Sequence, residues 1–75
     1  MARTKVNIQN QIRTLRFAKG EMTQQELADR VGVSRQTINA IEGGKYSPSL
    51  EVAFQIATTL EKPLDAVFQC VIRKK

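Results

Sequence analysis

The sequence predicts a small, mainly α-helical domain with a short β-strand near each end. Three observations indicate this fold class. The chain has 75 residues, enough for one domain with a modest core. Residues that cap helices recur before stretches with helical apolar spacing, and glycines stand where several of those stretches end. Strand-like alternation of apolar and polar residues is confined to the two ends of the chain.

Composition narrows the class of function. Twelve Lys and Arg against seven Asp and Glu leave a formal charge of +5 and a pI near 9.9. Such an excess favours polyanionic partners, nucleic acid first and an anionic membrane surface second, although it also serves solubility alone. The chain has no histidine and one cysteine, so we expect no metal centre, no cofactor and no catalytic site. It has no long apolar run and no signal-peptide pattern, which predicts a cytoplasmic protein without a membrane partner.

The first predicted elements are a strand over residues 5–8 and a helix after it. Residues 5–8 alternate between polar and apolar side chains. Asn10 is placed to cap a helix that reaches about Lys19. Gly20 then ends that helix, because glycine adopts the left-handed conformation at low cost.

Two short helices around a glycine follow. Thr23 and Glu26 form a T-x-x-E capping box, which predicts that a helix begins there. Gly32 is the turn residue, and Ser34 caps a third helix that runs to about Glu42, where two glycines stop it. The residues expected to face the core from both helices are Leu27, Ala28, Val31, Val33, Ile38 and Ile41.

A fourth helix is predicted from the cap Ser49 to about Leu60. Pro63 blocks its continuation, and residues 64–68 have the length for one further helical turn. The expected apolar stripe of the fourth helix is Leu50, Ala53, Phe54, Ala57 and Leu60.

Residues 67–73 fit either a helix or a strand, and their β-branched and aromatic residues favour a strand. A lone strand leaves backbone groups unpaired, so it needs a partner, either residues 5–8 or a second copy of the chain. We expect a small sheet near a dimer interface. We expect Cys70 to be a small buried hydrophobe rather than a redox sensor. The tail residues assigned to the dimer interface are Val67, Phe68, Cys70 and Ile72.

The spacing within residues 24–43 fits a helix-turn-helix. That motif needs a small residue in its first helix, a glycine at the turn and apolar residues at set offsets, as Ala28, Gly32, Ile38 and Ile41 provide. The chain resembles helix-turn-helix regulators of the Cro and lambda-repressor (XRE-like) type over residues 10–68. The stretch SRQTINAIEGGKYSPSL is particularly similar to the small bacterial members. The resemblance implies a five-helix DNA-binding domain as the single domain of residues 1–75.

The resemblance assigns base contacts to the start of the third helix. Arg35 and Gln36 fall where family members contact base edges, and Asn39 lies one turn further along. Arginine can bond guanine O6 and N7, and Gln or Asn can bond adenine, each with two hydrogen bonds. Thr37 is placed to touch a thymine methyl group or a phosphate. The alternative for Arg35 and Gln36 is an ordinary solvated helix face, and for Asn39 it is a side chain that faces solvent or the backbone.

Phosphate contacts are expected around this helix. The resemblance places Gln24 where a side chain and a backbone amide hold a phosphate, which helix N-termini favour. The other expected phosphate contacts are Ser34, Lys45, Tyr46 and Ser47. The loop residues Lys45 and Tyr46 have a second interpretation, in which they are simple connecting residues.

A structural ion pair is also implied. Family members pair an arginine at the end of the first helix with a glutamate at the end of the recognition helix, which correspond to Arg16 and Glu42. Phe17 departs from the polar residue usual at its position, and the sequence leaves open whether it is partly exposed or serves an interface.

The function that these observations predict is a homodimeric transcription regulator, most simply a repressor, bound to a palindromic DNA operator. The main alternative is the antitoxin of a toxin–antitoxin pair, which binds its operator and a protein toxin. A pure protein-interaction module is a third hypothesis. A partner protein, whether co-regulator or toxin, is compatible with the first two.

Overall fold

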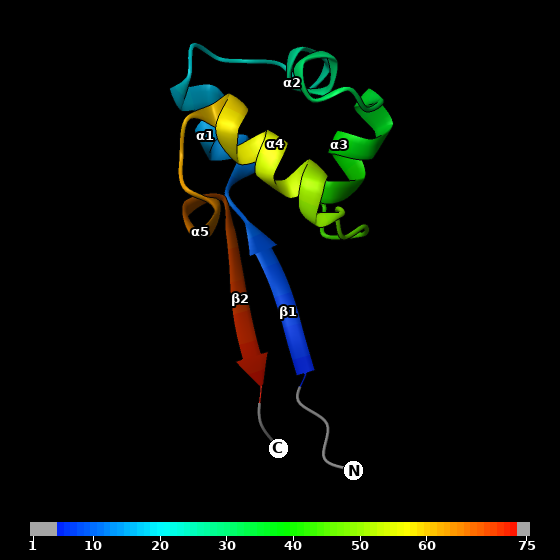
Figure 1. Cartoon of the computed structure of the whole chain (residues 1–75), viewed down its shortest axis with the longest axis vertical. Helices are drawn as coiled ribbons and strands as arrows, with labels where there is room; N and C mark the ends of the chain where they lie inside the picture. Colours follow the sequence, from blue (N-terminus) through cyan, green and yellow to red (C-terminus); the bar gives the residue numbers. More distant parts are fainter. Residues whose placement is uncertain (1–4, 74–75) are drawn as a thin grey trace.

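The computed structural model describes the backbone of residues 5–73 and the side chains of residues 8–70. Five helices form one body, and two strands project from it as a narrow two-stranded ribbon (Figure 1). The longest dimension of the molecule is 44 Å, about twice the other two. The elements in chain order are β1 (Lys5–Asn10), α1 (Ile12–Ala18), α2 (Gln24–Val31), α3 (Arg35–Glu42), α4 (Leu50–Leu60), α5 (Leu64–Val67) and β2 (Phe68–Arg73).

The helices α2, α3 and α4 begin where the capping residues predict. Thr23 and Glu26 form the complete capping box of α2, with both side chain–backbone hydrogen bonds present. Ser34 and Ser49 accept backbone N–H bonds at the starts of α3 and α4. Gly32 ends α2 with φ of 89°, a left-handed conformation that favours glycine.

The core lies between the helices and excludes part of the predicted α4 stripe. Ile56, which the predicted stripe omits, is fully buried, together with Ala53, Ala57 and Leu60 of the same helix. Leu50 and Phe54, predicted to be inside, are 68% and 51% exposed. The prediction was wrong because α4 is apolar on most of its surface, so spacing alone does not decide which face packs on α2. The largest fully buried side chains of the core are Ile12, Leu27, Ile38, Ile41, Ile56 and Val67.

The strands β1 and β2 pair antiparallel within one chain, with Ile8 opposite Cys70 and Lys5 opposite Arg73. Of the two partners that the sequence left open for the tail, the structure therefore shows the N-terminal segment. No third strand joins them in the part of the chain described, so Cys70 is exposed rather than buried as expected. The side chain of Ile72 lies outside the described residues.

Val67 is the last residue of α5 and is fully buried in the core of its own chain. It has no exposed surface with which to touch a partner, so its assignment to a dimer interface was wrong. Phe68 and Cys70 keep exposed surface at the start of β2.

Asn10 connects the ribbon to the helices. It ends β1 rather than capping α1 directly, since the N-cap position belongs to Gln11. The Asn10 Oδ1 atom still accepts a bond from the backbone N–H of Ile12 at 3.2 Å. Its Nδ2 atom donates to the carbonyl oxygen of Ile41, near the end of α3, at 3.0 Å. None of the helices described is long and apolar enough to span a bilayer.

Candidate nucleic-acid interface

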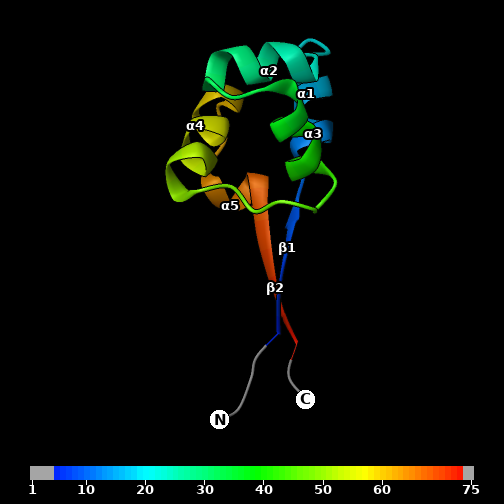
Figure 2. The ribbon, with the colours of Figure 1, turned by 90° about the vertical axis from the view of Figure 1, so that its right-hand side faces the viewer.

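The helices α2 and α3 form a bihelical unit joined by a tight turn (Figure 2). The left-handed Gly32 reverses the chain, and Ser34 begins α3 two residues later. Ile38 and Ile41 fix α3 to the core through one face. The opposite face of α3 is therefore presented to solvent.

The first turn of α3 carries two free polar side chains. Arg35 and Gln36 are both exposed. Arg35 has no acidic partner within 4.0 Å among the described residues, and neither side chain makes a hydrogen bond there. An arginine and a glutamine held side by side with unused donors match what is needed to bond base edges in a major groove.

A buried ion pair holds the far end of α3 in place. Arg16 Nε donates to Glu42 Oε2 at 2.7 Å, and Arg16 Nη2 donates to Glu42 Oε1 at 3.1 Å. These two side chains are only 6% and 9% exposed. Arg16 Nη1 also donates to the carbonyl oxygen of Met22 at 2.6 Å. The predicted pair is thus a bidentate salt bridge that joins α1 to α3.

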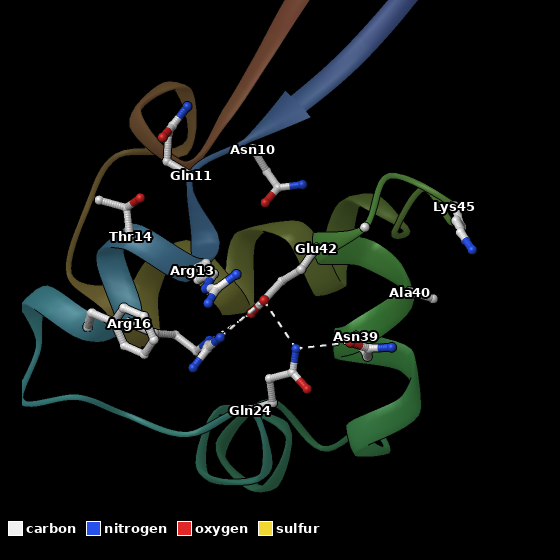
Figure 3. Close-up of a pocket in the computed structure, with 12 residues that line it drawn as sticks. Asn10, Gln11, Arg13, Thr14, Arg16, Gln24, Asn39, Ala40, Glu42 and Lys45 are labelled. Atoms are coloured by element: carbon white, nitrogen blue, oxygen red, sulfur yellow. Dashed lines mark hydrogen bonds and ion pairs between the residues drawn. The ribbon is translucent and has the colours of Figure 1, made fainter.

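Gln24 extends this network from the start of α2. Its Nε2 atom donates to Glu42 Oε1 at 3.1 Å and to Asn39 Oδ1 at 3.2 Å (Figure 3). Both donor hydrogens of the Gln24 amide are therefore used inside the protein. What remains for a phosphate at this position is the backbone N–H, which lies in the first turn of α2 where N–H groups lack helical partners.

The same bond orients Asn39. Its Oδ1 atom accepts from Gln24, and its Nδ2 group, beside Arg35 and Gln36 on the exposed face of α3, donates to no atom of residues 8–70. Orientation by a neighbouring amide reduces the rotamer freedom that a flexible side chain loses when it binds.

An open hollow of about 680 Å³ lies between α1 and α3 (Figure 3). Arg13 of α1 and Lys45, just after α3, are exposed cations that line it. Gln24 and Asn39 line it as well. The hollow thus combines positive charge with amide groups on the side of the molecule that carries the exposed face of α3.

The remaining predicted contacts are distributed over two sides. Ser34 and Thr37 bond each other through their hydroxyl oxygens at 2.9 Å, next to Gln36. Tyr46 is exposed and lines the same hollow as Gln36. Ser47 lines one hollow with Tyr46 and another, apolar one with Leu50 and Phe68, and neither of these includes Arg35 or Gln36.

Two residues of this surface were missed from the sequence. Ala40 lines both the hollow of Gln36 and that of Asn39. Its position four residues after Gln36 was the available signal, since residues four apart share one face of a helix. Arg13 lies on α1, one turn before Arg16, and only the packing of α1 beside α3 brings it here.

Phe17 is 51% exposed and lies between two arginines. The guanidinium carbons of Arg13 and Arg16 are 5.6 and 5.3 Å from the centre of its ring. Both distances suit cation–π attraction. The Phe17 ring therefore contacts the guanidinium groups of Arg13 and Arg16 and does not pack in the core.

Comparison with known proteins shows the family. A helix-turn-helix family matches residues 12–67, most of the chain. An uncharacterized HTH-type transcriptional regulator of Archaeoglobus fulgidus is 51% identical over 51 residues, 68% of this chain and 72% of the relative. A second such regulator, from Bacillus subtilis, is 39% identical over 61 residues, covering 81% of this chain and 91% of the relative.

A solved structure agrees with this result. The crystal structure of a Bacteroides fragilis protein assigned to DNA binding superposes with a TM-score of 0.72 and 26% sequence identity. The match covers 83% of this chain and 98% of that one. The chain belongs to the XRE-like helix-turn-helix transcriptional regulators, a family that binds DNA.

Proposed function

We propose that this protein is a transcriptional repressor that binds a palindromic operator as a homodimer and acts in the cytoplasm at the nucleoid. The observation that carries the proposal is the pair Arg35 and Gln36, exposed and without a hydrogen-bond or ion-pair partner in the part of the chain that is described, on a helix anchored by a buried ion pair. Asn39 extends the base-contacting edge, and Ala40 leaves room for a base or a thymine methyl group close to the helix backbone.

Phosphate contacts surround this edge in the proposed complex. The backbone amide of Gln24 and the cation of Lys45 stand on either side of the exposed face of α3. Thr37 and Tyr46 are the contacts expected nearest to Gln36, with the Ser34 hydroxyl bonded to Thr37. Contacts of this kind fix the orientation of the helix without specifying sequence.

The homodimer is supported by an apolar surface on another side. Leu50 is 68% exposed and Ile8 45% exposed, and both line a hollow of about 330 Å³ with Leu64 and Phe68. None of the residues that line this hollow is charged. Two copies can therefore meet there about a two-fold axis without opposing like charges.

This location modifies the interface expected from the tail. Phe68 remains part of it, Val67 does not, and the main contributors become Leu50 and Leu64 of α4 and α5. A dimer of this kind places two copies of α3 in successive major grooves, about 34 Å apart.

Selection of bound sequences from random DNA duplexes tests the proposal. The expected result is an inverted repeat whose half-sites are centred about one helical turn apart. Enrichment of no sequence, or of a single half-site without symmetry, would contradict sequence-specific binding or the dimer respectively.

A further inference from the structure

The net positive charge of this protein is not on its helix-turn-helix. Residues 11–67 contain seven Lys and Arg and seven Asp and Glu, so this helical part has no net charge. Residues 1–10 and 68–75 contain five Lys and Arg and no acidic residue, which accounts for the whole +5. These five are Arg3, Lys5, Arg73, Lys74 and Lys75.

The backbone brings two of these five residues together. In the antiparallel register of β1 and β2, Lys5 is the direct partner of Arg73 at the end of the ribbon farthest from the helices (Figure 1). Like charges directly opposite each other destabilise an antiparallel pair. The arrangement is unfavourable for the isolated chain and becomes favourable when a polyanion lies against the ribbon.

The ribbon starts beside the recognition helix. Asn10, the last residue of β1, donates to the carbonyl oxygen of Ile41 in α3 at 3.0 Å. Six residues of strand extend about 20 Å at the usual rise per residue, which is about the width of a DNA duplex. A protein bound through α3 therefore holds its basic tip within reach of phosphates that α3 does not touch.

We propose that the tip of the β1–β2 ribbon is a second DNA contact, which binds the phosphate backbone without regard to sequence. The inference rests on the proposed function, and it assigns sequence specificity and electrostatic affinity to different parts of the molecule. The helical body, which has no net charge, provides sequence specificity through Arg35 and Gln36. The ribbon provides most of the electrostatic affinity for DNA and its dependence on salt.

Two other partners of the ribbon can be compared with DNA, a second copy of the chain and an anionic membrane. Direct tip-to-tip pairing of two copies would bring Lys5 and Arg73 of one copy against the same two residues of the other, which is a repulsive contact. An anionic membrane attracts the same charges. DNA is favoured over a membrane because the ribbon is joined to the recognition helix through Asn10.

The test compares two variants of equal net charge. Lys5→Gln/Arg73→Gln removes two charges from the ribbon. Arg30→Gln/Lys62→Gln removes two exposed charges from the helical body, on α2 and in the turn after α4, away from the hollow between α1 and α3. Affinity for a random-sequence duplex is measured from about 50 to 200 mM salt, the range over which such contacts weaken steeply.

The ribbon variant is expected to bind random and selected duplexes more weakly by the same factor. The slope of log affinity against log salt should fall by about one for each charge removed. The body variant should keep the wild-type slope. The charge-conserving variant Lys5→Arg/Arg73→Lys should also keep it, which separates loss of charge from loss of the ribbon's fold.

Equal slopes for the ribbon variant and the wild type would overturn the inference. Binding of the wild type, but not the ribbon variant, to phosphatidylserine vesicles with an unchanged DNA slope would assign the ribbon to a membrane instead. Failure of the proposed function has a different signature: the wild type would show no preference for any duplex, while the ribbon variant would still lose affinity for random DNA.

Discussion

Two ion pairs with similar distances have very different environments. Arg16–Glu42 closes at 2.7 Å with both side chains almost fully buried. Lys19–Glu61 closes at 3.0 Å with the side chains 31% and 74% exposed. Burial rather than distance decides how much stability is lost when each pair is broken, because a buried charge that loses its partner has no water to replace it.

Glu42→Ala is therefore expected to destabilise the protein by about 3–5 kcal/mol, since it leaves the Arg16 guanidinium buried with only the Met22 carbonyl as partner. Urea denaturation followed by circular dichroism measures this loss. The control Glu61→Ala, which breaks the exposed pair, should cost at most about 1 kcal/mol. Equal losses in the two variants would show that the buried pair does not anchor α3.

At the scale of the elements, local chemistry accounts for most of the helix boundaries. The capping box of Thr23 and the caps Ser34 and Ser49 work through bonds within three residues, so the sequence alone predicts them. Gly32 likewise meets a requirement of its own backbone, a φ of 89°.

Substitution of Gly32 tests whether the turn requires a left-handed backbone conformation at this residue. A methyl group added there would meet no atom within 4 Å, so any cost of Gly32→Ala comes from the left-handed backbone, about 1–2 kcal/mol. Gly43→Ala is the matched control, because Gly43 has φ of −80° and its nearest contact is an ordinary 3.4 Å. It should lose no stability in thermal melts. A larger loss for Gly43→Ala would contradict this view of the turn.

What the sequence could not predict depends on how elements pack together. The exposure of Leu50 and Phe54 follows from which face α4 turns to α2, and the exposure of Cys70 from the absence of a third strand among the described residues. The bonds from Gln24 to Asn39 and Glu42 join α2 to α3 across 15 and 18 residues. No local pattern encodes such contacts.

For the whole molecule, three surfaces have distinct compositions. The exposed face of α3 is polar and carries the proposed base contacts. The hollow lined by Leu50 and Phe68 is uncharged, and the ribbon tip pairs Lys5 with Arg73. In the proposed complex, base recognition, self-association and electrostatic affinity therefore belong to different parts of one small chain.

The proposed dimer predicts a specific effect of Leu50→Gln. Because each substitution occurs on both sides of a two-fold interface, the loss of apolar burial counts twice and should weaken the dimer at least tenfold. Analytical ultracentrifugation measures the dimer dissociation constant. Phe17→Gln, which changes a residue exposed on α1 beside the arginines, should leave it unchanged. A Leu50→Gln protein that dimerises like the wild type would place the interface elsewhere.

Recognition of bases by α3 is tested most directly by the affinity of Arg35→Ala for every single-base variant of the selected operator. The wild type is expected to lose about 1–3 kcal/mol for a wrong base at one position of each half-site. Arg35→Ala should lose that discrimination at this position alone and keep both its thermal stability and its preferences at the other positions. Uniform weakening at all positions, or an unchanged profile, would contradict recognition of bases by α3.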